Sequence, residues 1–474
     1  MIKGKISKHA FTPSSVEKLQ GVEKDVFVSS LRITEHPFIN SRKKIRLLYF
    51  TALEHLVNLS ALNIEYANAR LIEYRNLLVN TETSTYLYGK KYILLRKNID
   101  KTVKKVVHDF FKPWKRKRCV MLLYDIALIL LDKAAVKKTL DIMAQYFDRR
   151  KQEKLNKLFE MLYNESYREI MFPEDFVKTK NMAPQFYANR DFAARQEMRI
   201  LVTANISAGK STLINAIVGK PVTKAAQEAC TSKLCFLYNK PFEDNRIHLL
   251  ASSLNLNATY DELITAEKEA VCSIASFFRV STRSQARVCL IDTPGVNSAV
   301  NRDHGILTRK AIVEETYDKL IYVLNANVLG TNDEIKHLKY VYENVPGEKV
   351  IFVLNKLDDS KKKEDSISGS IEGVKHDLQK IGFKNPIICP FSAYFSLLLK
   401  MKLNNENLSE DEQDVFDLYV KKFNKPEYDL SAYYDKTYME TLKDKYQIDN
   451  VLLKMGIISG LYGFEETLLY GGTK

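Results

Sequence analysis

The stretch that decides the fold runs Arg199-Ile-Leu-Val-Thr-Ala-Asn-Ile-Ser-Ala-Gly-Lys-Ser-Thr212 and continues as Leu213-Ile-Asn-Ala-Ile-Val218. Its first residues predict a buried strand, its small residues a tight turn, and its last segment a helix. Such a turn lets successive backbone N–H groups point at phosphate oxygens, and the helix N-terminus adds its positive dipole end. The order therefore predicts a phosphate-binding loop, although Ala204 stands where the usual first glycine would be.

The polar side chains of this loop suit a nucleoside triphosphate. Lys210 is expected to reach the β- and γ-phosphates, and the Ser211 hydroxyl is expected to ligate Mg²⁺. The nucleotide-binding residues predicted in the loop are Asn205, Ser207, Ala208, Gly209, Lys210, Ser211 and Thr212.

A second motif follows another apolar run. Arg287-Val-Cys-Leu-Ile291 predicts a buried strand that ends in Asp292-Thr-Pro-Gly295. A carboxylate at a strand end can hold Mg²⁺ through water, and the N–H of Gly295 is placed to sense a γ-phosphate. The metal-binding prediction is therefore Ser211 together with Asp292.

Two further motifs indicate which base is bound. The run Lys349-Val-Ile-Phe-Val-Leu354 leads into Asn355-Lys-Leu-Asp358, and Pro386-Ile-Ile-Cys-Pro390 precedes Phe391-Ser-Ala393. The carboxylate of Asp358 can accept from both N–H donors on the guanine edge, a pattern that adenine lacks. The base-side prediction comprises Asn355, Lys356, Asp358, Ser392 and Ala393.

Four motifs in this order predict an α/β fold, a P-loop GTPase domain over residues 196–474 with a central, mostly parallel sheet flanked by helices. The chain resembles the bacterial branch of the dynamin superfamily. The resemblance rests on the loop, on Cys230-Thr231, on Asp292-Thr-Pro-Gly295 and on Asn355-Lys-Leu-Asp358. Asp292 follows Thr231 by 61 residues, which implies an insertion of the dynamin type.

The resemblance implies catalytic roles for Lys210, Ser207, Thr231 and Gly295. Thr231 resembles the switch threonine that completes the Mg²⁺ coordination, and Ser207 resembles the residue that helps bind a monovalent cation, K⁺ or Na⁺. Val296 follows Gly295, so the water-orienting glutamine of Ras-like proteins is absent. The resemblance implies GTP hydrolysis to GDP and phosphate, activated by dimerisation through the GTPase domains of two identical or paired dynamin-like chains. Ile206 replaces a polar residue that is common in this loop of eukaryotic dynamins. Because Ala204 and Ile206 both depart from the common loop, a protein that binds GTP but barely hydrolyses it stays an alternative.

The N-terminal part differs from the rest in charge. Residues 1–190 carry 36 Lys and Arg against 20 Asp and Glu, whereas the remainder carries 36 against 38, within a net charge of +14. This part is poor in glycine and rich in Leu, Tyr and Lys, which predicts a helical bundle over residues 1–190. An apolar stripe is expected at Ile45, Leu48, Ala52, Leu56 and Leu59, and Asp125 is expected to give its helix one polar side.

The basic residues cluster at Arg42-Lys-Lys44, Lys112-Pro-Trp-Lys-Arg-Lys-Arg118 and Arg149-Arg-Lys151. They suit an anionic membrane surface, nucleic acid or an acidic protein, or form a solvated face without a partner. One hypothesis is membrane remodelling driven by GTP; the alternative is a nucleotide-gated module whose helical domain engages a protein or nucleic acid. The N-terminal residues lack the pattern of a secretory signal peptide, and the apolar run Cys119–Leu131 is too short to span a bilayer. The spacing of the cysteines is not that of a disulfide framework or a zinc site. The expected location is the cytoplasm, peripheral at the inner face of the cell membrane.

Overall fold

The computed structural model divides the chain into two compact units. The first comprises Met1–Ala194, Pro241–Arg246 and Leu254–Leu256, and the second comprises Arg195–Lys240, Ile247–Ser253 and Asn257–Lys474. Two short segments of the expected GTPase region thus belong to the first unit. The residues that the structure describes are 18–19, 22–79, 85–108, 116–163, 182–205, 207–223, 234–266, 271–280, 286–296, 303–326, 330–357, 367–445 and 450–471.

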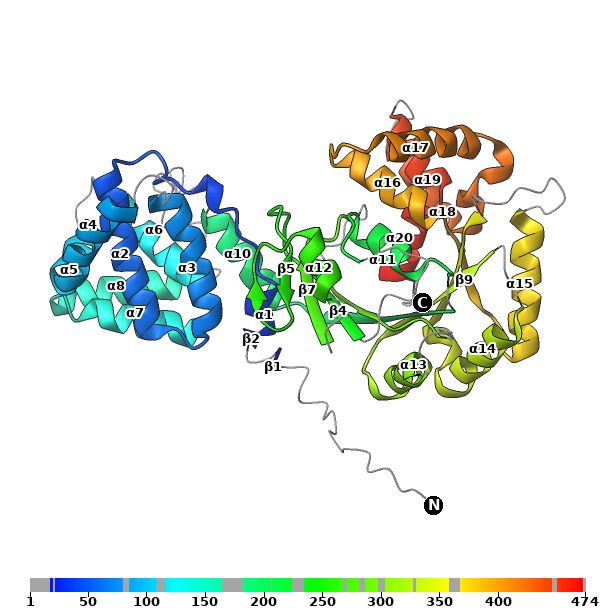
Figure 1. The fold of residues 1–474 in the computed structure, drawn as a ribbon, viewed down its shortest axis with the longest axis horizontal. Helices are drawn as coiled ribbons and strands as arrows, with labels where there is room; N and C mark the ends of the chain where they lie inside the picture. Colours follow the sequence, from blue (N-terminus) through cyan, green and yellow to red (C-terminus); the bar gives the residue numbers. More distant parts are fainter. Residues whose placement is uncertain are drawn as a thin grey trace, which may run out of the picture. The chain divides into compact units, whose positions relative to one another are not determined.

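The first unit is mainly helical, with one small two-stranded sheet (Figure 1). Its elements are β1 (Lys18–Leu19), β2 (Val22–Glu23), α1 (Lys24–Phe27), η2 (Ile33–Glu35), α2 (Lys43–Ser60), α3 (Ile64–Val79), α4 (Thr85–Lys97), α5 (Ile99–His108), α6 (Arg116–Leu130), α7 (Lys133–Ala144), α8 (Arg149–Tyr163) and α10 (Met182–Ala193). The stripe expected on α2 is partly wrong. Ala52 and Leu56 are buried, but Leu59 is 45% exposed, because Leu53 and Val57 share the buried face instead.

The polar side expected around Asp125 of α6 faces the interior of the first unit. Its carboxylate accepts hydrogen bonds from the Nε2 of His36 and the hydroxyl of Tyr74, both at 2.9 Å, and from the hydroxyl of Tyr49. Burial and the neighbouring carboxylate raise the pKa of Tyr74 well above its usual value. A buried carboxyl group is tolerated here because three donors from separate segments surround it.

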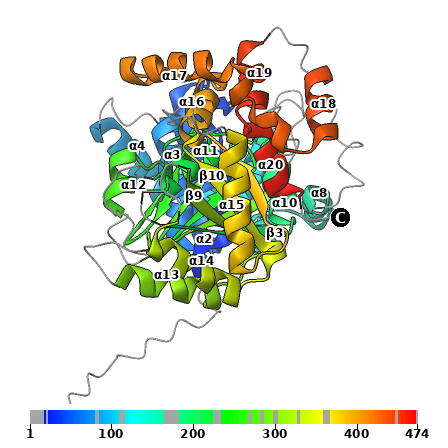
Figure 2. The ribbon, with the colours of Figure 1, turned by 90° about the vertical axis from the view of Figure 1, so that its right-hand side faces the viewer.

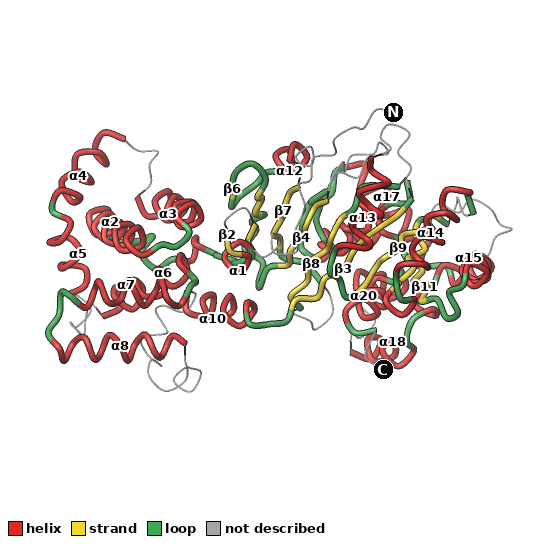
Figure 3. Tube along the Cα trace, turned by 90° about the horizontal axis from the view of Figure 1, so that it is seen from below, coloured by secondary structure: helices red, strands yellow, loops and turns green. Residues whose placement is uncertain are grey.

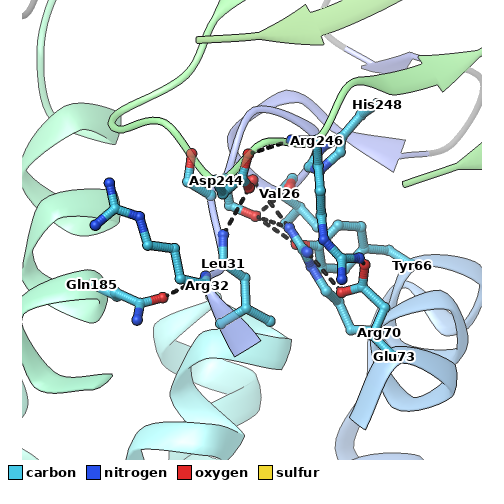
Figure 4. Close-up of polar contacts among 12 residues, drawn as sticks. Val26, Leu31, Arg32, Tyr66, Arg70, Glu73, Gln185, Asp244, Arg246 and His248 are labelled. Carbon is cyan, nitrogen blue, oxygen red and sulfur yellow. Dashed lines mark hydrogen bonds and ion pairs between the residues drawn. The ribbon is translucent and has the colours of Figure 1, made fainter. Parts of the chain in front are cut away.

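The segment Pro241–Arg246 is hydrogen-bonded within the first unit (Figure 4). The N–H of Leu31 donates to Asp244 at 2.9 Å, and Arg246 forms an ion pair with Glu73 of α3. Glu73 also accepts from the fully buried Arg70 at 2.9 Å. A segment that directly follows a strand of the second unit therefore completes a charged network of the first unit.

The larger sheet is mixed, with the order β11-β10-β9-β3-β8-β4-β7-β5-β6 (Figure 3), and all its strands except β6 belong to the second unit. Strand β3 is parallel to β8 and β9, β10 is parallel to β9 and β11, and β4 is parallel to β7, whereas the pairs β4–β8 and β5–β7 are antiparallel. The strands are β3 (Glu197–Ala204), β4 (Leu234–Asn239), β5 (His248–Leu250), β6 (Leu254–Asn255), β7 (Val271–Ser276), β8 (Arg287–Asp292), β9 (Lys319–Asn325), β10 (Val350–Asn355) and β11 (Ile387–Pro390). The predicted mostly parallel sheet is confirmed, and β5 to β7 form the expected insertion.

Helices cover both faces of this sheet. Helices α13 and α14 lie on one face, and α11 and α16 lie on the other (Figures 1 and 2). The helices of this unit are α11 (Lys210–Val218), α12 (Tyr260–Ala266), α13 (Asp303–Glu314), α14 (Asn332–Asn344), α15 (Ile367–Ile381), α16 (Ala393–Leu403), α17 (Glu410–Phe423), α18 (Lys436–Lys445), α19 (Val451–Ile458) and α20 (Leu461–Leu469), with 3₁₀ turns η5 (Gly347–Lys349), η7 (Pro426–Tyr428) and η8 (Leu430–Tyr433). Within the described parts of both units, no helix combines the length and apolarity needed to cross a bilayer.

Candidate nucleotide site

The phosphate loop connects β3 to α11, as the sequence predicts. Gly209 has a φ of +89°, and a Cβ there would lie 2.3 Å from the Nδ2 of Asn355, so both conformation and space require glycine. Ser207 also has a positive φ, at +63°, an unfavourable conformation for a non-glycine residue that is common at functional sites. The N-cap of α11 is Gly209, which offers no side chain to the first N–H groups of the helix. These donors therefore suit an anion.

Lys210 and Asp292 lie side by side although 82 residues separate them, because β3 and β8 are parallel and adjacent. Their side chains form a buried ion pair. Burial raises the pKa of Asp292, an effect that the charge of Lys210 opposes. The structure thus places the predicted phosphate-binding cation beside the predicted metal-binding carboxylate.

The Oδ2 atom of Asp292 is buried and has no hydrogen-bond partner among the described residues. An oxygen of this kind fits a hard cation such as Mg²⁺, and Ser211 lies in the first turn of α11, next to Lys210. Together with phosphate oxygens and water, these two side chains would hold the ion. The described residues contain no group of three His, Cys, Asp or Glu side chains, so a metal cage made by the protein alone is absent from them.

The end of β8 is joined to the end of β3 beyond Asp292. The N–H and the hydroxyl of Thr293 both donate to the carbonyl of Val202, at 3.3 and 2.8 Å. The N–H of Val296 donates to the carbonyl of Ala204 at 3.3 Å, and the Val296 side chain is buried. Gly295 is therefore held close to the phosphate loop, and the residue after it is apolar and packed.

Asn355, at the end of β10, connects the phosphate loop with the base-side loop. Its Nδ2 donates to the carbonyl of Ala208 at 2.9 Å, and its Oδ1 accepts from the N–H of Ala393 at 3.0 Å. Lys356, with a φ of +65°, directs its side chain past Gly209, whose Cβ would lie 3.9 Å from its Cε. Ser392 is buried as the N-cap of α16. The loops that were predicted to bind phosphate and base are thus joined by one side chain.

At the nucleotide site, Ile206, Thr231 and Asp358 lie outside the described residues, and so does Cys230 beside Thr231. Their roles in the loop, at the metal and at the guanine edge remain predictions, and so do the nucleotide contacts of the described site residues.

Sequence reasoning missed several residues that support the site. Asn215 of α11 accepts from the N–H groups of Val222 and Thr223 at 2.9 Å, and holds the segment that leads toward Thr231. His337 of α14 is hydrogen-bonded to Thr203 of β3 at 3.0 Å, and burial lowers its pKa to about 4. The polar Asn215 within an apolar helix was a usable signal. The partner of His337 lies 134 residues away, and nothing local indicates it.

A phosphate loop, a buried carboxylate on the neighbouring strand and an asparagine bridge to a base-side loop define a P-loop GTPase domain. Residues 200–357 match the model of the dynamin family. The chain is 26% identical over 200 residues to dynamin-like protein A of Bacillus subtilis (38% of this chain, 16% of that protein). It is 22% identical over 433 residues to dynamin-like protein 1 of Campylobacter jejuni (78% of this chain, 58% of that protein).

The matched regions thus span less than two thirds of the length of each of these relatives. Among solved structures, Era of Aquifex aeolicus bound to GDP and aluminium fluoride matches at 17% identity and a TM-score of 0.27, over 46% of this chain and 59% of that one. The family match and the two bacterial relatives confirm the resemblance that the motifs indicate. Residues 200–357 are thus similar to the GTPase domain of the dynamin family.

Proposed function

We propose that the chain hydrolyses GTP to GDP and phosphate with Mg²⁺. The observation that carries this proposal is the joining of the two loops by Asn355, with Lys210 and Asp292 at the phosphate end. Phosphoryl transfer to water needs positioning and charge compensation more than covalent chemistry. Lys210 would neutralise charge on the β- and γ-phosphates, Mg²⁺ would neutralise more, and the N–H groups at the start of α11 would hold the phosphate oxygens.

Guanine preference would come from Asp358, by accepting both N–H donors of the base edge. Competition between GTP and ATP for a labelled nucleotide tests this assignment. Asp358→Asn is expected to weaken the preference by about 1–3 kcal/mol, as one charged hydrogen bond is lost. Equal competition by ATP in the unchanged protein would refute the guanine assignment.

Activation by dimerisation is proposed on the chemistry around Gly295. Val296 is buried and tied to Ala204, so this position supplies no side chain to orient water. Charge compensation would instead come from a monovalent cation at Ser207, and the attacking water would be positioned by Thr231 once the dimer orders it. With Mg²⁺ and K⁺ present, GTP turnover per molecule should rise as the protein concentration rises. A rate that does not depend on concentration would contradict activation by dimerisation, and an absence of turnover would contradict GTP hydrolysis itself.

For the helical unit we propose an anionic membrane surface as the partner. One face of α4 presents Lys90, Ile93, Leu94 and Lys97 at helical spacing. All four are exposed, with Ile93 at 53% and Leu94 at 61%. Apolar side chains flanked by lysines suit the boundary between headgroups and acyl chains, and each lysine near an anionic surface adds about 1 kcal/mol. Of the expected basic clusters, residues 112–115 lie outside the described residues.

Sedimentation with phosphatidylcholine vesicles, with and without phosphatidylglycerol, tests this surface. The double substitution Lys90→Glu and Lys97→Glu should abolish the binding that depends on anionic lipid. Lys154→Glu with Lys157→Glu is the matched control, because it reverses the same number of exposed lysine charges on α8, outside the basic clusters named in the sequence analysis. Equal loss in both variants would indicate unspecific charge attraction, and binding to nucleic acid in place of vesicles would favour the alternative function.

A further inference from the structure

The C-terminal end of the phosphate-binding helix α11 lies against two cationic side chains. The Nζ of Lys400 donates to the carbonyl of Ile217 at 2.9 Å, and the Nη1 of Arg279 donates to the carbonyl of Gly219 at 2.9 Å. The backbone N–H of Arg279 donates to the carbonyl of Val218 at 2.9 Å. Carbonyls at a helix end carry the negative end of its dipole, so cations are favoured here.

The packing leaves no room at this end of α11. Gly219 has a φ of +83°, and a Cβ there would lie 2.8 Å from the Cβ of Arg279 and 3.0 Å from the Cδ of Lys400. The stems of both cations therefore press directly against the backbone of the turn. The axial position of α11 is fixed at the end opposite to Lys210.

Each cation has a carboxylate partner. Lys400 pairs with Glu465 of α20 at 2.6 Å, and their side chains are 1% and 2% exposed. Arg279 pairs with Glu406, which is partly exposed. Burial lowers the pKa of Lys400, while the charge of Glu465 opposes this effect. A fully buried ion pair is weak evidence for stability, because apolar residues of similar volume usually serve as well.

The location of Lys400 in the chain connects this cluster with the nucleotide site. Lys400 belongs to α16, and the first residue of α16 is Ala393, whose N–H is bound by Asn355. Helix α16 thus carries the base-side loop at its start and holds the phosphate helix two turns later. The distance between the two loops depends on how α11 and α16 are held together.

We propose that Lys400, paired with Glu465, is a positioning residue that sets α11 against α16 and so fixes the spacing between the phosphate and base-side loops. This inference rests on the proposed nucleotide site. On this proposal the buried pair raises the affinity for nucleotide, because Lys400 holds α11 through the carbonyl of Ile217, and contributes little to the stability of the fold. Helix α20 becomes part of the site's support through Glu465.

The test compares three variants by thermal unfolding and by titration with fluorescent GDP. Lys400→Met leaves Glu465 buried without its partner charge, so the melting temperature should fall and the Kd for GDP should rise about tenfold, as one charge-assisted hydrogen bond is lost. Adding Glu465→Leu removes the stranded charge. The double variant should regain its melting temperature but keep the raised Kd, because the carbonyl of Ile217 still lacks its donor.

Lys319→Met is the matched control. Lys319 of β9 donates to the carbonyls of Thr467 and Leu468 at 3.3 and 2.6 Å, so it has the same chemistry at the end of α20. This variant should lower the melting temperature and leave the Kd within about twofold. Normal GDP affinity in the double variant, or an equal loss in the control, would overturn the proposal; if Lys400→Met does not fold, the double variant decides alone. If the wild-type protein binds GDP but does not hydrolyse GTP, the proposed hydrolysis is refuted. The comparison of GDP affinities among the variants can still be interpreted in that case.

Discussion

Replacing Asn355 by alanine should uncouple the phosphate loop from the base-side loop. The substitution removes the donor to the carbonyl of Ala208 at 2.9 Å and the acceptor of the N–H of Ala393 at 3.0 Å. Asn355 is 3% exposed, so water cannot readily replace it. The two lost bonds are worth about 2–3 kcal/mol together, which corresponds to an increase of about 30- to 150-fold in the Kd for nucleotide.

Titration with fluorescent GDP measures this change directly, and thermal unfolding without nucleotide shows whether the variant folds. The matched control is Asn325→Ala. Asn325 ends the neighbouring strand β9 and donates to the carbonyl of Ser207 in the same loop, but at 3.4 Å and in an exposed position. Its removal should change the Kd by less than about threefold. A variant of Asn355 that binds GDP as tightly as the wild type would refute the bridging role.

Three further predictions follow from the described contacts. Lys210→Ala should abolish the stabilisation by GTP in a thermal shift assay, and it should also lower the apo melting temperature because Asp292 is left buried without its partner charge. Burial lowers the pKa of His337 to about 4, whereas its unfolded pKa is about 6.5. As pH falls from 6.5 toward 4, the unfolded chain binds a proton that the folded protein does not, so about 3 kcal/mol of the free energy of unfolding is lost. His337→Gln should therefore flatten the pH profile of urea unfolding. Asp125→Leu should lower the free energy of unfolding by about 3–5 kcal/mol, since it leaves three buried donors unpaired, whereas Tyr74→Phe should lower it by about 1.5–3 kcal/mol.

The GTPase domain could be predicted from the sequence because its signals are local and ordered. Each motif directly follows an apolar strand, and neighbouring parallel strands end at the same edge of a sheet. Asp292 and Lys210 therefore meet although 82 residues separate them. The asparagine of the third motif was assigned to the base, but its bridge to Ala208 depends on side-chain geometry that spacing does not encode.

The helical unit was predicted only in outline. Its glycine-poor composition indicates helices, yet it does not indicate which face of α2 is buried, and Leu59 was placed on the wrong side. The burial of Asp125 depends on donors 51 to 89 residues away. The segment Pro241–Arg246 is polar and contains a proline, so it reads as a solvated loop; its partner Leu31 lies 213 residues from Asp244.

That segment has a practical consequence for anyone who dissects the protein. The covalent chain passes between the two units after residues 194, 240, 246, 253 and 256. A fragment that stops at residue 194 would lack Asp244, Arg246 and Leu256, and would expose Val26 and Tyr66, which pack against Leu256. Such a fragment should be prone to aggregation, and a protease cut near residue 194 should leave both halves noncovalently associated. The first unit therefore cannot be transferred to another protein as residues 1–194 alone. A chimaera must also include Pro241–Arg246 and Leu254–Leu256, because these segments belong to the same unit.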